Sequence, residues 1–283
     1  MRALVLGSTG MLGLGVCKSL SNQGIKVDGT FQKDKSNLVD KVGLNKAIVY
    51  DAYDSLYSDL RLPVKVADYD FVVNCIGIIN RKADSNKEGT ILLNSIFPRR
   101  ASRLCKVQGV PFIHITTDCV YDGKHGMYNE DSPHSALDIY GRTKSLGEPS
   151  DCMVLRTSII GEEIHTYSSL IEWVKAQAGP DRDFSTIQGY VNHFWNGITT
   201  TEYGDLIYKI IKNNLYQEEL FHIFSPQSVS KFTLVKMIAD QFKLNLNIVE
   251  YEAETSIDRT LDSKKDLVHK LNINPLERQV QQL

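Results

Sequence analysis

Tyr140 and Lys144 could carry out proton transfer together. They stand four residues apart in the segment Tyr140-Gly-Arg-Thr-Lys144, and on a helix this spacing places both side chains on one face. A phenol ordinarily ionises near pH ~10, and a neighbouring ammonium stabilises the phenolate and lowers that pKa. A tyrosine tuned in this way can act as a general acid. The spacing alone is common on surface helices, so the surrounding elements must support it.

A glycine-rich segment near the start of the chain could hold a phosphate group. Residues 6–13 read Leu-Gly-Ser-Thr-Gly-Met-Leu-Gly, between an apolar run at residues 3–6 and a helical pattern at residues 11–23. Glycines let the backbone turn tightly and approach a pyrophosphate, whose charge is met by amides at the helix N-terminus. This context predicts a dinucleotide-binding loop, with cofactor contacts from Gly7, Thr9, Gly10, Met11, Leu12 and Gly13.

The end of the second expected strand favours NADP(H) over NAD(H). A fold that selects NAD usually places an aspartate or glutamate there, which binds the ribose hydroxyls and repels a 2′-phosphate. Residues 30–32 include no carboxylate, and Lys33 adds a positive charge. The alternative cofactor stays open, because a shift of two residues in the strand end would bring Asp28 to the ribose.

Two further segments are expected to line the cofactor. Asp51 follows the third expected strand and could accept a hydrogen bond from the adenine amino group, or it could only cap the next turn. Cys75, Ile76 and Gly77 stand at the end of the fourth strand, at the edge of the sheet where ligands of such folds bind. We expect the backbone of these three residues to face the cofactor.

The elements that must position these residues alternate along the chain. Apolar, β-rich runs are followed by helical patterns, which predicts an α/β fold with a doubly wound parallel sheet of the Rossmann type. Strands are expected at residues 3–6, 26–31, 47–50, 70–75, 111–116 and 153–156, and helices at residues 11–23 and 90–107. Residues 1–160 are therefore predicted to form an NADP-binding domain.

The rest of the chain has a different pattern. Helices are expected at residues 168–178, 202–213 and 231–242, with an irregular stretch at residues 179–186. Residues 161–283 are therefore predicted to form a smaller, mostly helical C-terminal domain that binds the substrate. Within it, residues 191–215 are expected to return and pack on the first domain.

Composition limits the classes of function. The 283 residues include 32 Lys and Arg against 34 Asp and Glu, and 42% are hydrophobic, which is enough for a sizeable core. A net charge of −2 without a lysine-rich block argues against a nucleic-acid partner, and no run of ~18 apolar residues indicates a membrane span. Five scattered cysteines without a C-x-x-C pair indicate neither a disulfide framework nor a zinc site. We expect a cytoplasmic protein without a metal.

Together these features resemble the extended short-chain dehydrogenases/reductases. The glycine loop, residues 116–118 after the fifth strand and the pair Tyr140 and Lys144 occur in that family's order and spacing. A narrower resemblance, to the dTDP-4-dehydrorhamnose reductase branch, is carried by residues 117–123, 128–133, 140–148 and 155–158 together with Asn94 and Pro98.

The resemblance implies a nucleotide-linked 4-keto-6-deoxyhexose as substrate and NADPH as the hydride donor, in deoxysugar biosynthesis for surface polysaccharide. Thr117 would hydrogen-bond the C4 carbonyl, and Tyr140 would protonate the developing alkoxide. Lys144 would tune Tyr140 and hold the nicotinamide ribose. The resemblance also implies that Arg156 lies on the cofactor side and that Asp118 contacts the substrate.

Cys119 departs from two related patterns. Sugar-nucleotide 4,6-dehydratases place a glutamate after the Thr-Asp pair, and the rhamnose reductases usually place a tyrosine there. A cysteine at this position is similar to the epimerase-reductases that make GDP-fucose, in which a thiol and a histidine exchange protons beside the ketone, and His193 could be the partner. We expect Cys119 only to pack against the substrate, with a 3,5-epimerase-reductase as the alternative.

Two segments of the second domain are expected to bind the sugar nucleotide. Residues 192–200 combine aromatic, amide and hydroxyl groups, which suits a sugar pocket. His193, Trp195 and Asn196 are the candidates there, although a surface turn with one buried tryptophan would have the same composition. Arg259 has the planar fork that binds a diphosphate, or it forms an exposed salt bridge with a neighbouring aspartate.

A different class of protein stays open. The regulatory subunit of methionine adenosyltransferase is similar to the same family, and there the fold binds a cofactor and a partner without catalysis. The intact Thr117, Tyr140 and Lys144 favour an enzyme. The nucleotide, dTDP or UDP, the C2 substituent, the stereochemistry at C4 and the formation of a homodimer are left open.

Overall fold

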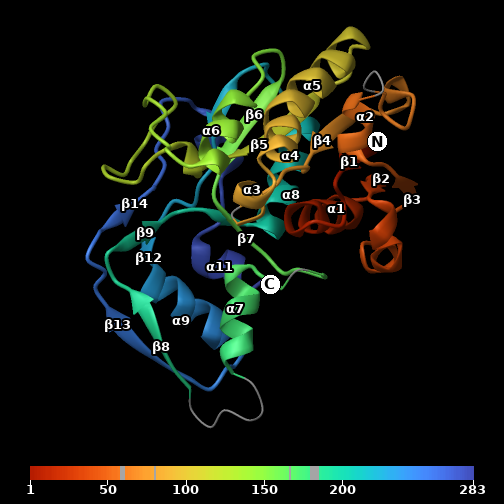
Figure 1. Ribbon diagram of the computed structural model, residues 1–283. Coiled ribbons are helices and arrows are strands. Elements are labelled where there is room, and N and C mark those ends of the chain that lie inside the picture. The colour runs from red at the N-terminus through yellow and green to blue at the C-terminus, as the bar shows by residue number, and fades with distance from the viewer. Residues whose placement is uncertain (58–60, 80, 166, 179–184) are drawn as a thin grey trace.

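The computed structural model describes residues 1–57, 61–79, 81–165, 167–178 and 185–283. Its largest element is a seven-stranded sheet with the strand order β11-β6-β5-β4-β1-β2-β3 (Figure 1), in which every adjacent pair is parallel. The strands are β1 (Arg2–Leu6), β2 (Lys26–Phe31), β3 (Lys46–Val49), β4 (Phe71–Asn74), β5 (Phe112–Thr117), β6 (Met153–Thr157) and β11 (Leu220–His222). The doubly wound α/β fold is confirmed, and β11 is an edge strand that the sequence did not predict.

The central strands are buried on both faces, as a parallel sheet requires. Every residue of β4, β5 and β6 is buried. Successive side chains point to opposite faces of a strand, so Ala3 and Val5 of β1 join the apolar cluster on one face, whereas Leu4 and Leu6 join the cluster on the other. For this reason the strands appear in the sequence as continuous apolar runs.

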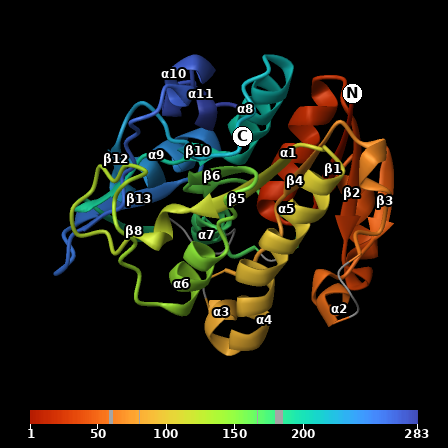
Figure 2. The same cartoon turned by 90° about the horizontal axis from the view of Figure 1, so that it is seen from above.

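Helices cover both faces of the sheet, as Figure 2 shows. On one face, two glycines let a pair of helices approach closely. A Cβ on Gly15 would lie 2.5 Å from Thr200 Cβ, and a Cβ on Gly204 would lie 2.5 Å from Ser19 Cβ. The helices on this face are α1 (Met11–Asn22) and α8 (Thr200–Lys212), and those on the other face are α2 (Ala52–Tyr57), α4 (Lys87–Ile91), α5 (Phe97–Val107) and α6 (Ile139–Leu146). Side chains of α8 therefore share the core of the sheet.

The helix expected over residues 90–107 is divided into three parts. A π-helical turn, Leu92–Ile96, lies between α4 and α5. Pro98 has no amide hydrogen to donate to the Asn94 carbonyl, so the regular bonding pattern is interrupted there. The Asn94 carbonyl is closely approached by Gly147, on which a Cβ would collide with that oxygen. The interruption thus lies where α6 packs against the segment after β4.

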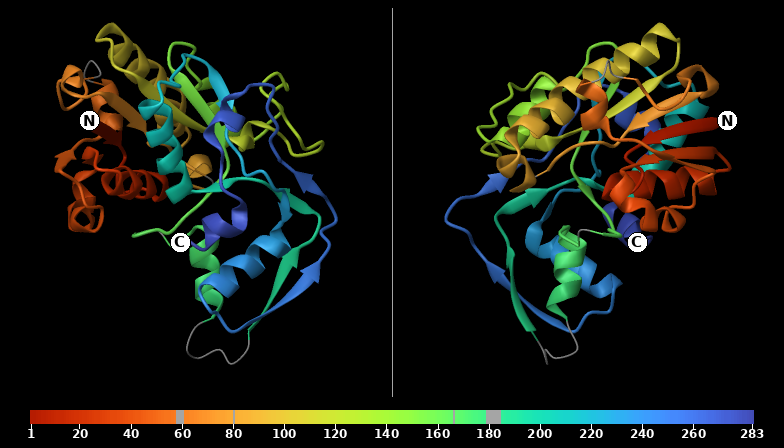
Figure 3. Two further views of the ribbon diagram at one scale, coloured as in Figure 1. Left: turned by 180° about the vertical axis from the view of Figure 1, so that it is seen from behind. Right: turned by 45° about the vertical axis from the view of Figure 1, so that its right-hand side comes forward.

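A smaller lobe lies below the sheet in Figures 1 and 3. The expected helices at residues 168–178 and 231–242 are found as α7 (Leu170–Gln177) and α9 (Lys231–Gln241), and both contribute to a separate apolar cluster around Trp195. The sequence did not predict the strands of this lobe, which are β8 (Ser185–Tyr190) paired with β13 (Leu246–Tyr251), and β9 (His193–Trp195) between β12 (Val229–Ser230) and β14 (Ile257–Asp258). Residues 179–184 of the expected irregular stretch lie outside the described residues.

Short elements connect the two parts of the molecule. β7 (Ile159–Ile160) pairs with β10 (Ile198–Thr199) where the chain passes between the sheet and the smaller lobe. The remaining elements used below are α3 (Arg81–Ser85), α10 (Leu267–Leu271), α11 (Leu276–Val280) and the 3₁₀ helices η1 (Lys33–Lys41) and η4 (Asp118–Val120). Among the described helices, none is both long and apolar enough to cross a membrane.

Candidate active site

The carboxyl ends of β1, β4 and β5 meet at one edge of the sheet. Gly7 follows β1, Cys75 follows β4 and Asp118 follows β5. The helix α6, which carries Tyr140 and Lys144, packs against the turn after β5. Ligands of open α/β sheets bind at this edge, so the fold brings the predicted cofactor residues and the predicted catalytic residues to one place.

The glycine loop has the geometry of an anion-binding turn. Gly7 has a φ of 82°, which favours glycine, and its amide donates to Thr30 Oγ1 over 2.9 Å. A Cβ on Gly13 would collide with the Gly7 oxygen, so a side chain there would push the loop away from the helix. The helix α1 begins at Met11 without an acidic residue or a side-chain cap in its first turn. The loop and this N-terminus therefore fit a dinucleotide pyrophosphate.

The other predicted loop residues have different surroundings. Thr9 is buried, and Gly10 is the N-cap of α1. Leu12 packs against the core of the sheet. Ile76, after β4, borders the loop from the other side, since a Cβ on Gly7 would lie 3.0 Å from its Cγ1. Backbone groups, rather than these side chains, thus face the space for the cofactor.

Asp28, which left NAD(H) open as a cofactor, is held inside the protein. It is buried in the middle of β2 and accepts hydrogen bonds from Arg2 Nη2 over 2.6 Å, from Asn45 Nδ2 over 2.7 Å and from Tyr69 over 2.8 Å. Since β2 ends at Phe31, the shift that would bring this carboxylate to a ribose is not found.

Asp51 has the local contacts of a capping residue. Its Oδ1 accepts from the Tyr53 amide over 2.8 Å and from the Asp54 amide over 3.3 Å, at the start of α2. Its Oδ2 accepts from Gln32 Nε2 over 3.1 Å. The capping interpretation therefore describes this carboxylate, and its second oxygen ties the end of β3 to the end of β2.

Two lysines and a histidine gather beyond β2, with Asp34 and Asp51 beside Lys35. Burial lowers the pKa of Lys35 in η1, and the charge of Lys82 in α3 lowers it as well. Burial also lowers the pKa of His165, followed by the charge of Lys35, and His165 Nδ1 is buried without a hydrogen-bond partner among the described residues. We name Lys35, Lys82 and His165 the cation cluster. The sequence analysis selected Lys33, which is exposed at the start of η1, and did not select any of these three residues.

The hydroxyl groups of Thr117 and Tyr140 lie near enough to interact. Thr117 ends β5, and its Oγ1 donates to Asp118 Oδ1 over 3.2 Å and accepts from the Cys119 amide over 3.1 Å. Gly141 lets α6 come this near, because a Cβ there would collide with the Cys119 oxygen. Burial raises the pKa of Tyr140, and the interaction with Thr117 lowers it. Tyr140 therefore holds its proton, which is the state a general acid requires.

Lys144 lies one helical turn after Tyr140 and points toward the end of β4. Its Nζ donates to the Ile115 oxygen over 2.9 Å, and burial lowers its pKa to about 8. A Cβ on Gly77 would lie 3.8 Å from this Nζ. Lys144 and the segment after β4 are thus brought together beside the glycine loop, on the side expected for the nicotinamide ribose.

Asn94 braces this arrangement. It is buried in the π-helical turn, its side chain donates to the Ile78 oxygen and accepts from the Ile78 amide, both over 2.8 Å, and it donates to Thr143 over 3.3 Å. It therefore ties the segment after β4 to α6, which carries Lys144. In the sequence analysis Asn94 only matched a position of the family, and no role was assigned to it. Pro98, four residues later, is the local feature that could have indicated an interrupted helix at Asn94.

The other side of the site is formed by η4 and the smaller lobe. Burial and, after it, the charge of Asp118 raise the pKa of Cys119 to about 12, so the thiol is protonated. Burial also raises the pKa of Asp118, whereas Arg259 and Lys231 lower it. Arg259 Nε donates to the backbone oxygen of Tyr121 over 3.0 Å. Arg259 thus reaches the site, together with Lys231, which the sequence analysis missed.

Two residues selected for a sugar pocket have other contacts. The His193 ring stacks on Tyr190 with 4.4 Å between ring centroids, and its Nε2 is 3.2 Å from the Thr255 oxygen. Trp195 is buried in the smaller lobe, and its Nε1 donates to Ser158 over 2.8 Å. His193 is therefore held at the edge of the lobe, and Trp195 belongs largely to its core.

Asn196 is also engaged within the protein. Its Nδ2 donates to the Leu261 oxygen over 2.7 Å, and its Oδ1 accepts from the Leu261 amide over 2.9 Å. Both polar ends of this buried side chain are thus occupied by one residue. These contacts hold the chain segment just after Arg259 in place, and they leave neither end of the Asn196 amide directed at a sugar.

Arg156 was expected to lie on the cofactor side, but its contacts in the structure are all within the protein. Its guanidinium is buried, and its N–H groups donate to Glu148, Tyr121, His222 and His134. An arginine has five such donors, and these contacts use all of them. Arg156 is therefore a structural brace between β6 and its neighbours and has no donor left for a cofactor.

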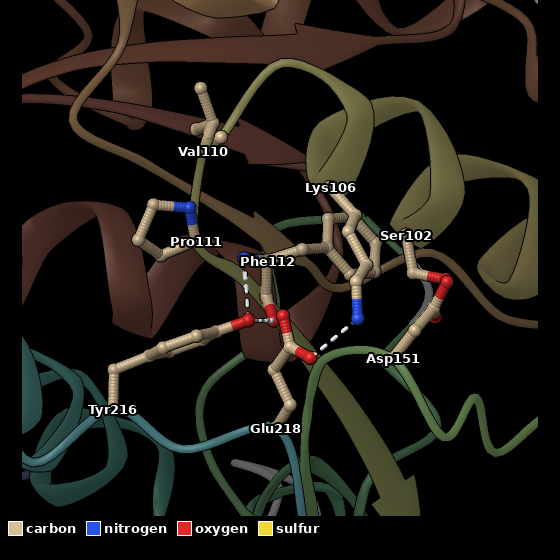
Figure 4. Close-up of a pocket in the computed structure, with 9 residues that line it drawn as sticks. Ser102, Lys106, Val110, Pro111, Phe112, Asp151, Tyr216 and Glu218 are labelled. Carbon is tan, nitrogen blue, oxygen red and sulfur yellow. Dashed lines mark hydrogen bonds and ion pairs between the residues drawn. The ribbon is translucent and has the colours of Figure 1, made fainter.

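A hollow of about 140 Å³ lies elsewhere, beside the amino end of β5 (Figure 4). Lys106 pairs there with Glu218 over 2.6 Å, and the Phe112 amide donates to Tyr216 over 3.3 Å. Ligand pockets usually have volumes of about 300 to 1,000 Å³, so this hollow is too small for a sugar nucleotide. Within the described parts of the chain, no group of three metal-ligating side chains is found.

A glycine loop after β1, a threonine at the end of β5 and a tyrosine and lysine on one helix define an enzyme of the short-chain dehydrogenase/reductase type. The chain belongs to the family of the RmlD substrate binding domain, whose model matches residues 1–277. The resemblance seen in the sequence is thereby confirmed.

Three relatives illustrate the range of this similarity. A probable low-salt glycan biosynthesis reductase of Haloferax volcanii is 25% identical over 279 residues, which cover 92% of this chain and 86% of the relative. The β subunit of methionine adenosyltransferase 2 of Xenopus tropicalis is 23% identical over 262 residues, 86% of this chain and 72% of the relative. The crystal structure of dTDP-4-dehydrorhamnose reductase of Bacillus anthracis, in complex with NADP, has a TM-score of 0.73 at 16% identity and covers 99% of this chain and 97% of its own.

Proposed function

We propose that this chain is an NADPH-dependent reductase of the C4 ketone of a nucleotide-linked 4-keto-6-deoxyhexose. The observation that carries the proposal is the contact between Thr117 and Tyr140 at the carboxyl end of β5. Two hydroxyl groups that converge beside the glycine loop suit a carbonyl oxygen on which negative charge develops. The names of the relatives, among them reductases of glycan and deoxysugar biosynthesis, support the substrate class.

The residues of the chain have distinct roles in this proposal. NADPH, when bound, supplies the hydride. The glycine loop and the N-terminus of α1 hold its pyrophosphate, and Lys144 with the backbone of residues 75–77 faces the nicotinamide ribose. Thr117 orients the substrate carbonyl by a hydrogen bond, and the Tyr140 hydroxyl gives its proton to the carbonyl oxygen. The Lys144 ammonium then stabilises the tyrosinate that is left.

NADP(H) is proposed over NAD(H) on two observations. Asp28 is saturated by Arg2, Asn45 and Tyr69 inside β2, so it does not stand at the end of the strand where it would select NAD(H). The cation cluster lies just beyond the same strand end, and charged donors of this kind bind phosphate strongly. We therefore assign the 2′-phosphate to the cation cluster rather than to Lys33.

The alternative of a 3,5-epimerase-reductase has less support. A base at Cys119 would need a thiolate, and burial holds the pKa of that thiol at about 12. The proposed partner His193 is engaged with Tyr190 and Thr255. We infer that Cys119 packs against the hexose.

A non-catalytic, cofactor-binding subunit is the alternative from a different class. It is suggested by the name of the methionine adenosyltransferase relative. A purely regulatory chain would not need the contact between Thr117 and Tyr140 or the lysine one turn later, and all three are in place. The arrangement therefore supports catalysis.

The experiment that tests the proposal is NADPH oxidation with a panel of dTDP- and UDP-linked 4-keto-6-deoxyhexoses. Turnover of at least one member, with formation of the 4-hydroxy sugar, is expected. NADPH binding without oxidation by any member would favour the binding subunit. The same panel determines the nucleotide, the C2 substituent and the configuration at C4.

We also propose a cytoplasmic location, because all five cysteines are free and thiols persist in a reducing compartment. The role in surface polysaccharide and the homodimer stay predictions of the sequence. Two separate apolar clusters support a division into a sheet domain and a smaller lobe, but α8, β11 and α10 of residues 161–283 contribute to the cluster of the sheet.

A further inference from the structure

Lys231 is a cation at the end of a helix where a cation is disfavoured. It is the first residue of α9, and the first turn holds no acidic residue. A helix N-terminus carries partial positive charge, which stabilises anions and destabilises an ammonium. The cap itself is made by Ser230, which accepts from the Thr233 amide over 3.1 Å. Lys231 is therefore not needed for the helix, and a nearby anion would relieve its electrostatic cost.

The side chain of Lys231 reaches into the candidate active site. Its Nζ lies 5.1 Å from the centroid of the Trp195 ring, and Asp118 and Cys119 face it. Within the described part of the chain, no hydrogen bond or ion pair of this ammonium is found. Burial lowers its pKa to about 8, which agrees with a charge that lacks a close partner.

Arg259 is a second cation in the same place. Its Nε donates to the Tyr121 oxygen, whereas its terminal nitrogens have no partner among the residues that the structure describes. One carboxylate, Asp118, faces both cations. Lys231, Arg259 and Asp118 together therefore carry one positive charge in excess, with open donors beside the pair Thr117 and Tyr140.

One small sheet fixes both cations. Lys231 follows β12 and Arg259 follows β14, and β9 lies between these strands, as Figure 1 shows. Val229 pairs with Trp195, and Asp258 pairs with Phe194. Residues held on strand ends are positioned more precisely than residues on a free loop. The fold thus presents two fixed cations to the same point of the site.

We propose that Lys231 is a specificity-determining residue that, together with Arg259, binds an oxyanion of the nucleotide-sugar substrate. This inference rests on the proposed function, which supplies that substrate. The oxyanion is the diphosphate, because the hexose of the proposed substrate is deoxygenated at C6 and has no carboxylate there. An ammonium is a compact point charge that suits a phosphate, and the arginine fork adds paired donors.

The first test measures the affinity of the whole 283-residue chain for UDP, UDP-glucose and UDP-glucuronic acid. Lys231→Met removes the charge and keeps an apolar stem, and Lys236→Met is the matched control, because Lys236 is an exposed lysine of the same helix. If the diphosphate is the partner, Lys231→Met weakens all three ligands roughly tenfold or more, as expected for a charge-assisted hydrogen bond. Weaker binding of UDP-glucuronic acid alone would place Lys231 beside the sugar of that ligand and would contradict the assignment to the diphosphate.

The second test uses pH and a charge-preserving variant. Affinity of the parent protein should fall as the pH rises above about 8, because the free ammonium must be charged to bind. In Lys231→Arg the affinity should stay constant over the same range, because a guanidinium keeps its proton. The other groups that face Lys231 are Asp118, Cys119 and Arg259, and all three are present in both proteins, so the flattened profile identifies Lys231.

Several outcomes would overturn the inference. Equal affinity of the parent and Lys231→Met for all three ligands would do so, and so would the same pH profile in Lys231→Arg as in the parent. A parallel loss of NADPH affinity in Lys231→Met would indicate general damage to the fold and would also refute a specific role. Intact Lys231-dependent binding without reduction of any ketone would contradict the proposed function alone.

Discussion

The edge of the sheet at the carboxyl ends of β1, β4 and β5, which we call the cofactor edge, and the smaller lobe hold their proposed functional residues in different ways. At the cofactor edge, Gly7, Cys75 and Thr117 stand directly after or at the ends of parallel strands, so chain order alone brings them together. In the lobe, Lys231 and Arg259 meet only because two short strands flank a third. The residues of a site at strand ends can be predicted from the order of strands in the sequence. The residues of a site that combines side chains of separate elements cannot, because their proximity depends on tertiary packing.

The largest expected effect is a loss of stability on substitution of Arg156. This substitution tests whether Arg156 has a structural role or binds the cofactor. Arg156→Met leaves Glu148, whose side chain is 11% exposed, without its buried partner. Breaking one side of a buried ion pair usually costs about 3 to 5 kcal/mol. We therefore expect the free energy of unfolding, measured by urea denaturation, to fall by that amount.

Two measurements complete this test of Arg156. Arg103→Met removes an exposed arginine of α5 and should change stability by less than about 0.5 kcal/mol. NADPH affinity of folded Arg156→Met should equal that of the parent protein. A selective loss of NADPH affinity with unchanged stability would return Arg156 to the cofactor side.

The second prediction concerns Tyr140. Tyr140→Phe removes the proton donor and keeps the ring, so ketone reduction should fall by roughly 10²-fold or more, while NADPH affinity is retained. Single-turnover kinetics and fluorescence titration measure the two quantities. Turnover within a few-fold of the parent would remove Tyr140 from the mechanism and leave the cofactor edge as a binding site only.

The third prediction compares two lysines that follow β2. Lys35→Ala should weaken NADPH binding roughly tenfold, because one charge-assisted contact to the 2′-phosphate is lost, and should leave NADH binding nearly unchanged. Lys33→Ala should affect neither cofactor. The opposite pattern, with the effect at Lys33, would restore the expectation from the sequence and exclude the cation cluster as the phosphate site.

The limits of the sequence analysis follow from the same physics. The central strands β1, β4, β5 and β6 were predictable because a parallel strand that is buried on both faces is rich in apolar residues. By contrast, β11 has three residues and β12 and β14 have two each, too few for any periodicity. The role of Asp28 depends on Arg2 and Tyr69, which converge on it only in the fold. Trp195 was selected by composition, and burial in a core selects the same residue type as a sugar pocket does.

The smallest effect is expected at Cys119, on the border between the two regions. With a pKa of about 12, only about one thiol in 10⁵ is ionised at neutral pH, so Cys119 is a poor base for the carbons that flank the ketone.

In D₂O the Tyr140→Phe variant, which separates proton exchange from reduction, should incorporate no deuterium at C3 or C5 of the substrate. Cys119→Ser should change substrate affinity by a few-fold at most and leave the reduction rate nearly intact, because the hydroxyl fills the same space. The contrary result would be deuterium at C3 or C5 in Tyr140→Phe that is lost in the double variant Tyr140→Phe, Cys119→Ser. The thiol would then be a catalytic base, and the chain would be an epimerase-reductase.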